Sequence, residues 1–115
     1  MFALKNAIKL SKRVALYIPS TVDVDTATDN REQIAACASL LSSLFGGATA
    51  TAARGYWMSG AAGLVGEDVT VVYSFGTAEQ MTEHMPDVVR FAEQLKKDMA
   101  QEAISLEYNG ELYLI

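Results

Sequence analysis

The chain has 115 residues, of which half are hydrophobic and a fifth are charged, and its formal net charge is −5 at pH 7. This length fits a single domain of the usual size, roughly 100–150 residues, and the apolar content excludes a disordered chain. The acidic balance argues against direct binding of nucleic acid, because an acidic body repels the phosphate backbone.

The cysteine and histidine content limits the compartment and the cofactors. Cys37 is the single cysteine, so no intramolecular disulfide forms, and His84 is the single histidine, so the usual transition-metal ligand sets are excluded. Lys5 and Lys9 interrupt the N-terminal apolar residues where a signal peptide would be continuous. No apolar run reaches the ~20 residues of a membrane helix. We therefore expect a cytoplasmic protein with no metal, no cofactor and no membrane partner.

An aspartate cluster invites a calcium interpretation that its spacing does not support. Asp23, Asp25 and Asp29 follow the first positions of a calcium loop, but Thr28 replaces the glycine at the sixth position and Ile34 the glutamate at the twelfth. Helix capping and solvation explain these carboxylates better.

The N-terminal half predicts an arm, a strand and a helix. Residues 1–12 form a basic arm, with a short amphipathic helix over residues 2–11 that is too short to be stable alone. A strand over residues 14–18 ends at Pro19, which has no N–H for a ladder. A helix capped by Thr28 or Asp29 then carries an apolar stripe and ends at Gly46-Gly47.

The C-terminal half predicts more strands and a second helix. A strand over residues 49–58 and a glycine-rich loop over 59–66 precede a central strand over 69–75. Thr77 and Gln80 form a capping box, and Pro86 is expected to kink or split the helix that follows. Asn109-Gly110 predicts a two-residue hairpin that leaves Leu112 and Leu114 on a second, apolar face.

This order, β-α-β-β-α-β plus one strand from the final hairpin, defines the fold class. It predicts an α+β, ferredoxin-like arrangement over residues 13–115, with two helices on one face of an antiparallel sheet.

The chemistry-bearing residues favour recognition over catalysis. Nothing places Cys37 beside His84, so we expect no catalytic residue. Trp57 is expected in the core, with an exposed aromatic rim as the alternative. We expect a protein-binding surface on the strand face beside Trp57, on the glycine loop and on the acidic residues that follow the loop. Its residues are Arg54, Tyr56, Met58, Leu64, Glu67 and Asp68.

Several segments resemble small uncharacterised ferredoxin-like proteins of phages and mobile elements of gut bacteria. The segments are 17–21 (YIPST), 45–49 (FGGAT), 55–59 (GYWMS) with 63–65 (GLV), and 101–103 (QEA) leading to 109–113 (NGELY). The resemblance implies a genomic context in which small acidic proteins bind host or defence proteins, as inhibitors of the anti-CRISPR type do.

We therefore favour a non-enzymatic module that binds another protein with a basic surface, or a second copy of itself as a homodimer. The alternatives are a small cofactor-independent enzyme of the dimeric ferredoxin-like type and a structural homodimer module. An enzyme would need several titratable groups in one concave site, and the positions expected to face the core are almost all apolar.

Overall fold

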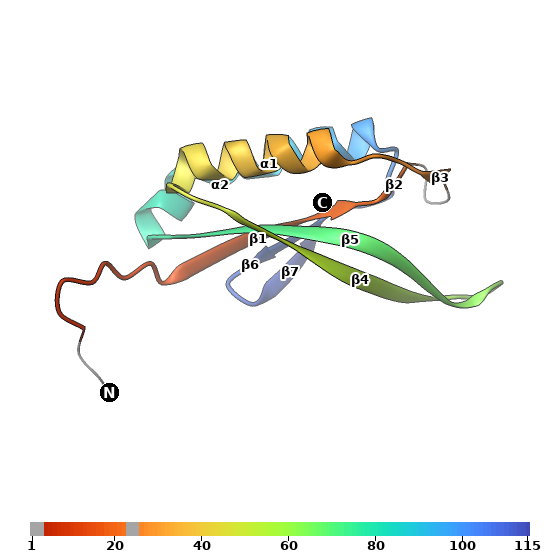
Figure 1. The fold of residues 1–115 in the computed structure, drawn as a ribbon, viewed down its shortest axis with the longest axis horizontal. Coiled ribbons are helices and arrows are strands. Elements are labelled where there is room, and N and C mark those ends of the chain that lie inside the picture. Colours follow the sequence, from red (N-terminus) through yellow and green to blue (C-terminus); the bar gives the residue numbers. More distant parts are fainter. Residues whose placement is uncertain (1–3, 23–25) are drawn as a thin grey trace.

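An antiparallel sheet organises the chain in the computed structural model, which describes residues 4–22 and 26–115. The elements are β1 (Lys12–Pro19), β2 (Thr21–Val22), β3 (Thr26–Ala27), α1 (Arg31–Phe45), β4 (Thr49–Ser59), β5 (Gly63–Gly76), α2 (Ala78–Asp98), β6 (Ser105–Tyr108) and β7 (Glu111–Leu114). The main sheet has the strand order β4-β5-β1-β6-β7, and β2 and β3 pair separately. Both helices lie on one side of the main sheet (Figure 1).

The topology confirms the ferredoxin-like α+β prediction. Each neighbouring pair in the main sheet is antiparallel. β5 lies between β1 and β4, so the connection through α1 spans a strand that comes later in the chain. This is the split βαβ arrangement, and β7 extends it by one strand at the β6 edge.

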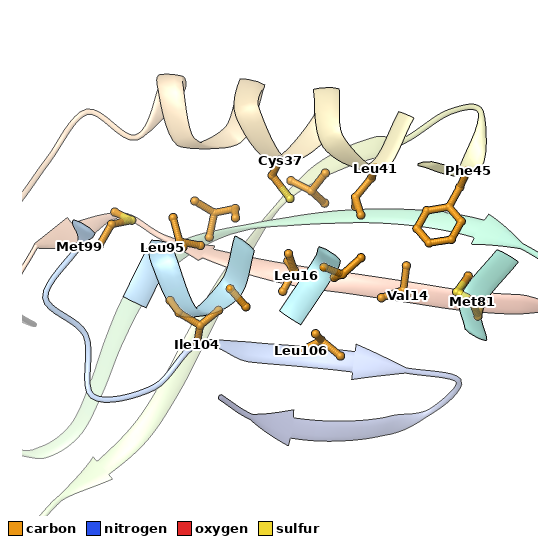
Figure 2. Close-up of a cluster of buried hydrophobic side chains, with 14 residues drawn as sticks. Val14, Leu16, Cys37, Leu41, Phe45, Met81, Leu95, Met99, Ile104 and Leu106 are labelled. Carbon is orange, nitrogen blue, oxygen red and sulfur yellow. The ribbon is translucent and has the colours of Figure 1, made fainter. Parts of the chain in front are cut away.

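The core fills the space between the sheet and the helices. Val14, Leu16 and Ile18 alternate along β1 and are fully buried, as strand periodicity requires for the face that meets the helices. Cys37 of α1 and Leu95 of α2 close over them from the helix layer (Figure 2). Each fully buried aliphatic side chain of this kind contributes about 1.5–3 kcal/mol.

The N-terminal arm departs from its prediction. Residues 4–11 contain no helix; the backbone turns at Lys5 and Asn6, where Asn6 has φ of 60°, and then runs on without regular structure. Leu4 and Ile8 are 69% and 89% exposed. The predicted helix is wrong because so short a segment does not sustain a helix by itself. Leu10, near the end of the arm, instead lines a hollow with Phe45 and Tyr73.

Helix α1 begins one residue later than predicted. Asn30 is its N-cap without a side-chain cap bond, and its amide instead donates to the Pro19 carbonyl at 2.9 Å. Asp29 accepts hydrogen bonds from the backbone and side chain of Arg31, which lower the pKa of Asp29 to about 2. Asp23 and Asp25, the other members of the aspartate cluster, lie outside the described residues.

Helix α2 confirms its capping box but not a split. The Thr77 hydroxyl accepts from the Gln80 N–H at 3.1 Å, and the Gln80 side chain accepts from the Thr77 N–H at 2.8 Å. Pro86 lies inside one continuous helix. Both Pro86 and Thr82 are exposed, so water is available to the Thr82 carbonyl that loses its usual helical donor.

The predicted glycine loop is present but shorter than expected: a turn over residues 60–62 closes the hairpin, because β4 and β5 pair without interruption from Thr49↔Tyr73 to Ser59↔Gly63. Gly66 therefore lies inside β5. A Cβ on Gly66 would lie 2.9 Å from the Tyr56 ring and 3.0 Å from the Arg54 guanidinium. Glycine is needed there for close packing of two cross-strand side chains, and not for a turn.

The final hairpin confirms its prediction. Asn109 and Gly110 have φ of 50° and 89°, as a type I′ turn requires. Tyr108 pairs with Glu111 and Leu106 with Tyr113. Leu112 and Leu114 are 57% and 70% exposed on the other face.

A glycine pair at the end of α1 offers a clean stability test. Gly46 has a left-handed φ of 96°, whereas the φ of Gly47 lies outside the left-handed region. A Cβ at either position would meet nothing within 4 Å. We expect Gly46→Ala to cost about 1–2 kcal/mol, because the Cβ strains the left-handed conformation, and to lower Tm by about 4–8 °C per kcal/mol.

Thermal unfolding followed by circular dichroism measures this difference, with Gly47→Ala as the matched control. Equal Tm values for the two variants would contradict the assigned role of Gly46 in ending the helix.

Candidate functional site

The sheet face that points away from the helices carries the candidate site. Tyr17 and Pro19 of β1 share this face with Gly55 and Trp57 of β4, Glu67 and Val69 of β5 and Ser105 of β6, according to the strand register. A pocket of about 190 Å³ opens between them. Its lining is completed by Tyr56, Gln101, Ala103 and Ile104.

Glu67 is the carboxylate of this pocket, and two polar residues hold it in position. The Thr21 hydroxyl donates to Glu67 Oε2 at 3.2 Å. The Gln101 amide in turn donates to the Thr21 carbonyl at 2.8 Å and to the Met99 carbonyl at 3.1 Å. Glu67 is therefore fixed by a chain of hydrogen bonds that joins β5 to β2 and to the segment after α2.

A second polar network lies on the same sheet face and reaches the pocket through Tyr17. Tyr17 donates from its hydroxyl to Glu107 Oε1 at 3.1 Å, and Arg13 Nε lies 3.5 Å from Glu107 Oε2. The Arg13 guanidinium stacks 4.1 Å from the centre of the Tyr73 ring. Burial and the bond to Glu107 raise the pKa of Tyr17, so its hydroxyl keeps its proton at neutral pH and stays a donor.

Trp57 provides the apolar surface of the pocket, and the expectation that it is a core residue is wrong. Its side chain is 39% exposed and lies opposite Val65. By the strand register, Trp57 lies on the face that points away from the helices, and both helices lie on the other side of the sheet (Figure 1), so no helix covers it. The indole is therefore available to a planar ligand.

The predicted binding surface divides into two faces of the ribbon. By the β4–β5 register, Glu67 and the other predicted residues point to opposite sides. The residues on the second side are Arg54, Tyr56, Met58, Leu64 and Asp68. Tyr56 still contributes to the pocket lining, between Gly55 and Trp57.

The second side of the ribbon holds an exposed ion pair and apolar side chains. Arg54 contacts Asp68 at 3.1 Å and lies 5.8 Å from the centre of the Tyr56 ring, and the bonds to Asp68 and Tyr56 raise the pKa of Arg54. Met58 and Leu64 are 75% and 65% exposed at the far end. An exposed pair of this kind adds little to stability, because water screens the charges.

Sequence reasoning missed Tyr17, Thr21 and Gln101 as members of a site. Their types carry no motif, and only the tertiary structure brings residues so distant in the chain to one pocket. A signal was present all the same, because segments 17–21, 55–59 and 101–103 are among those on which the family resemblance rests.

The remaining titratable groups show no further catalytic constellation. Cys37 is fully buried, and burial raises its pKa to about 12. His84 packs edge-on to the Phe45 ring at 5.9 Å. In the part of the chain that the structure describes, no three His, Cys, Asp or Glu residues gather as a metal site. Within residues 4–22 and 26–115, no helix is both long and apolar enough to cross a membrane.

Comparison with known proteins finds structural neighbours only. No protein-family model matches the chain, and no curated protein matches its sequence. The structure is similar to that of a phage SAM lyase in complex with S-methyl-5′-thioadenosine, with TM-score 0.69 and 16% identity. The apo state of a phage SAM lyase is similar with TM-score 0.66 and 17% identity. Each comparison covers 98% of this chain and 95% of the other.

These neighbours overturn the leading functional expectation. A non-enzymatic protein-binding module, with an anti-CRISPR-type inhibitor as its sharpest form, is contradicted because the structures that share this fold over nearly the whole chain are those of an enzyme. The expectation was wrong because it looked for titratable groups at the core-facing positions of the fold only. The pocket lies instead on the uncovered sheet face, where Glu67 and Tyr17 are partly exposed.

The buried thiol gives a test of reactivity. We expect Cys37 to resist a thiol reagent such as DTNB in the folded protein, because the thiolate is the reactive form and a pKa near 12 leaves about one thiol in ten thousand ionised at pH 8. One thiol per chain should react in guanidinium chloride. In the folded state the slow reaction should still be accelerating at pH 10; rapid labelling at pH 8 would contradict the burial.

Proposed function

We propose that this protein is a small cofactor-independent lyase that cleaves a sulfonium nucleoside of the S-adenosylmethionine type and releases S-methyl-5′-thioadenosine. Two observations support the proposal: the fold likeness to a phage SAM lyase over 98% of the chain, and a pocket that combines a carboxylate with an indole. The observation that carries it is Glu67 held by Thr21 beside the exposed Trp57.

The chemistry of such a substrate matches the pocket. At neutral pH the substrate carries a positive sulfonium, a positive ammonium and one carboxylate, so its net charge is positive. Glu67 supplies the opposite charge, and an acidic chain attracts a cation over a longer range. The adenine ring can stack on Trp57, an interaction worth about 1–3 kcal/mol per base in nucleic-acid complexes.

The reaction requires no redox partner. The bond between sulfur and the γ-carbon of the amino-acid chain breaks, and its electron pair stays on sulfur, which becomes a neutral thioether. The γ-carbon of the four-carbon fragment regains an electron pair in one of two ways: the fragment loses a proton to a base, or its own carboxylate closes a ring on that carbon. In both routes the protein's task is to orient the amino-acid chain and to limit the access of water.

The residues of the two polar networks have different roles in this proposal. Glu67 accepts hydrogen bonds from the substrate or pairs with its cation, while Thr21 and Gln101 act as positioning residues that hold the carboxylate. Tyr17, kept protonated, donates to an acceptor on the ligand if its bond to Glu107 opens.

A matched pair of variants on β5 tests the proposal. We expect the purified protein to convert S-adenosylmethionine to S-methyl-5′-thioadenosine, measured by liquid chromatography. Glu67→Gln should lower kcat/KM by about 10- to 100-fold, because a hydrogen bond to a charged group is worth about 1.5–3 kcal/mol. Asp68→Asn, one residue on but facing the opposite side of the ribbon, should leave it within about twofold.

The outcomes of this assay separate the proposal from its alternatives. If the wild-type protein releases no S-methyl-5′-thioadenosine, the lyase assignment fails. If the wild type is active and both variants keep full activity, the activity resides outside the Glu67 pocket.

We also propose that the same sheet face mediates self-association. Leu112 and Leu114 are exposed on it, and β7 forms the edge of the sheet, where an unpaired strand offers backbone groups to a second chain. A second copy packed there would lie against the face that carries the pocket.

Charge substitutions on the two sheet faces test this association. We expect Leu112→Lys combined with Leu114→Lys to raise the Kd of self-association at least tenfold, because burying each leucine is worth about 1.5–3 kcal/mol. Sedimentation equilibrium measures it. Leu64→Lys, equally exposed but on the other side of the ribbon, is the control. A wild-type chain that stays monomeric at high concentration would contradict the proposal.

A further inference from the structure

Gly55 lies in the middle of a regular strand, and no contact within the folded chain requires a glycine there. β4 pairs with β5 without a break on both sides of Gly55, so the position is not a bulge. Its φ lies outside the left-handed region, and a Cβ built on it would meet only the Glu67 carbonyl oxygen, at an ordinary contact distance of 3.9 Å. A residue with a side chain could therefore occupy the position without strain.

Gly66, in the neighbouring strand, has the packing reason that Gly55 lacks. A Cβ on Gly66 would lie 2.9 Å from the Tyr56 ring. Glycine inside a strand costs stability, because the unfolded chain is freer and no side chain packs. A bulge, a left-handed φ and a crowding side chain are all absent at Gly55, so the close approach of a ligand is the reason that remains.

The position of Gly55 fits a contact with a ligand. Gly55 faces the open side of the sheet, directly opposite Glu67 and two residues before Trp57. All three residues line the pocket of about 190 Å³. A side chain at position 55 would project into this pocket beside the carboxylate and the indole. Its absence exposes strand backbone on which a flat ring can rest.

The volume of the pocket indicates how much of a ligand enters it. About 190 Å³ is less than the roughly 300–1,000 Å³ of pockets that enclose a whole drug-sized molecule. The pocket therefore suits one ring system, with the rest of the ligand outside it. Trp57 offers a π-face to such a ring, and the bare backbone at Gly55 offers a floor.

We propose that Gly55 is a specificity-determining residue whose bare backbone seats the planar base of a purine nucleoside against Trp57. The inference rests on the proposed function, because S-adenosylmethionine and S-methyl-5′-thioadenosine share the adenine ring. A larger residue at position 55 closes the seat but suits the strand, so ligand affinity falls while the stability of the fold rises.

Intrinsic fluorescence reports on this seat directly, because Trp57 is the single tryptophan. A larger pocket, of about 360 Å³ between α2 and the β6–β7 hairpin, lies on the helix side of the sheet, and a ligand bound there would not stack on the indole. S-methyl-5′-thioadenosine titrated into the wild-type protein should therefore quench the Trp57 emission and give its Kd at the seat.

A graded series at position 55 tests the proposal. Gly55→Val should raise the Kd for S-methyl-5′-thioadenosine at least tenfold, and Gly55→Ala should raise it less, because its side chain is smaller. Both variants should raise Tm by about 2–8 °C, since glycine weakens a strand that alanine or valine would support. Ala53→Val, exposed on the same face of β4 but outside the pocket lining, is the control and should leave the Kd within about twofold.

The fate of this inference is separable from that of the lyase. A lower Tm in either Gly55 variant would overturn the inference, since the glycine would then be structural. An unchanged Kd for Gly55→Val, or a wild-type protein that binds no S-methyl-5′-thioadenosine, would overturn it as well. Cleavage of S-adenosylmethionine decides the lyase independently: binding that depends on Gly55, without any cleavage, would support the seat and remove the lyase.

Discussion

The burial of β1 between two strands and under two helices is the constraint on which the rest of the structure depends. Val14, Leu16 and Ile18 are fully buried on the helix side, and even Ala15 on the opposite side is inaccessible to solvent. β1 pairs with β5 along its whole length and with β6 through Val14, Ala15 and Leu16. The strand therefore sets the register of both neighbouring strands and the height at which α1 and α2 rest.

Both helices lie on one side of the sheet, so the other side stays uncovered and carries the first of two candidate surfaces. On the side away from the helices, the β4–β5 ribbon, β1 and β6 leave the hollow that contains Glu67 and Trp57. On the helix side, α2 and the β6–β7 hairpin leave the larger apolar pocket between them. A fold with four strands and no terminal hairpin would lack the second surface altogether.

The electrostatics of the chain are organised around these surfaces. The carboxylates of Glu67 and Glu107 lie on the open face, each held by a hydroxyl donor. The basic arm is the one segment of opposite character, since Lys5 and Lys9 precede the acidic body. A cationic small molecule at the first surface would be attracted by the acidic body over a longer range than its direct contacts.

The sequence by itself determined the elements whose signals are local. The Thr77–Gln80 capping box, the left-handed Gly46 and the Asn109-Gly110 turn act over a few residues, so their geometry follows from chain chemistry alone. The same local signals, together with alternation in the strands, were enough for the ferredoxin-like order of elements.

Only the tertiary structure decided the extent of the ribbon, the fate of the arm and the composition of the site. Gly66 belongs to a strand because the Tyr56 and Arg54 side chains pack over it, a contact that composition does not reveal. The arm is not helical because so short a segment does not sustain a helix by itself, and the hollow that Leu10 lines with Phe45 and Tyr73 forms only in the folded chain. Glu67, Thr21 and Gln101 meet through hydrogen bonds between residues 46 and 80 positions apart, and such proximity follows from the sheet order and not from any local pattern.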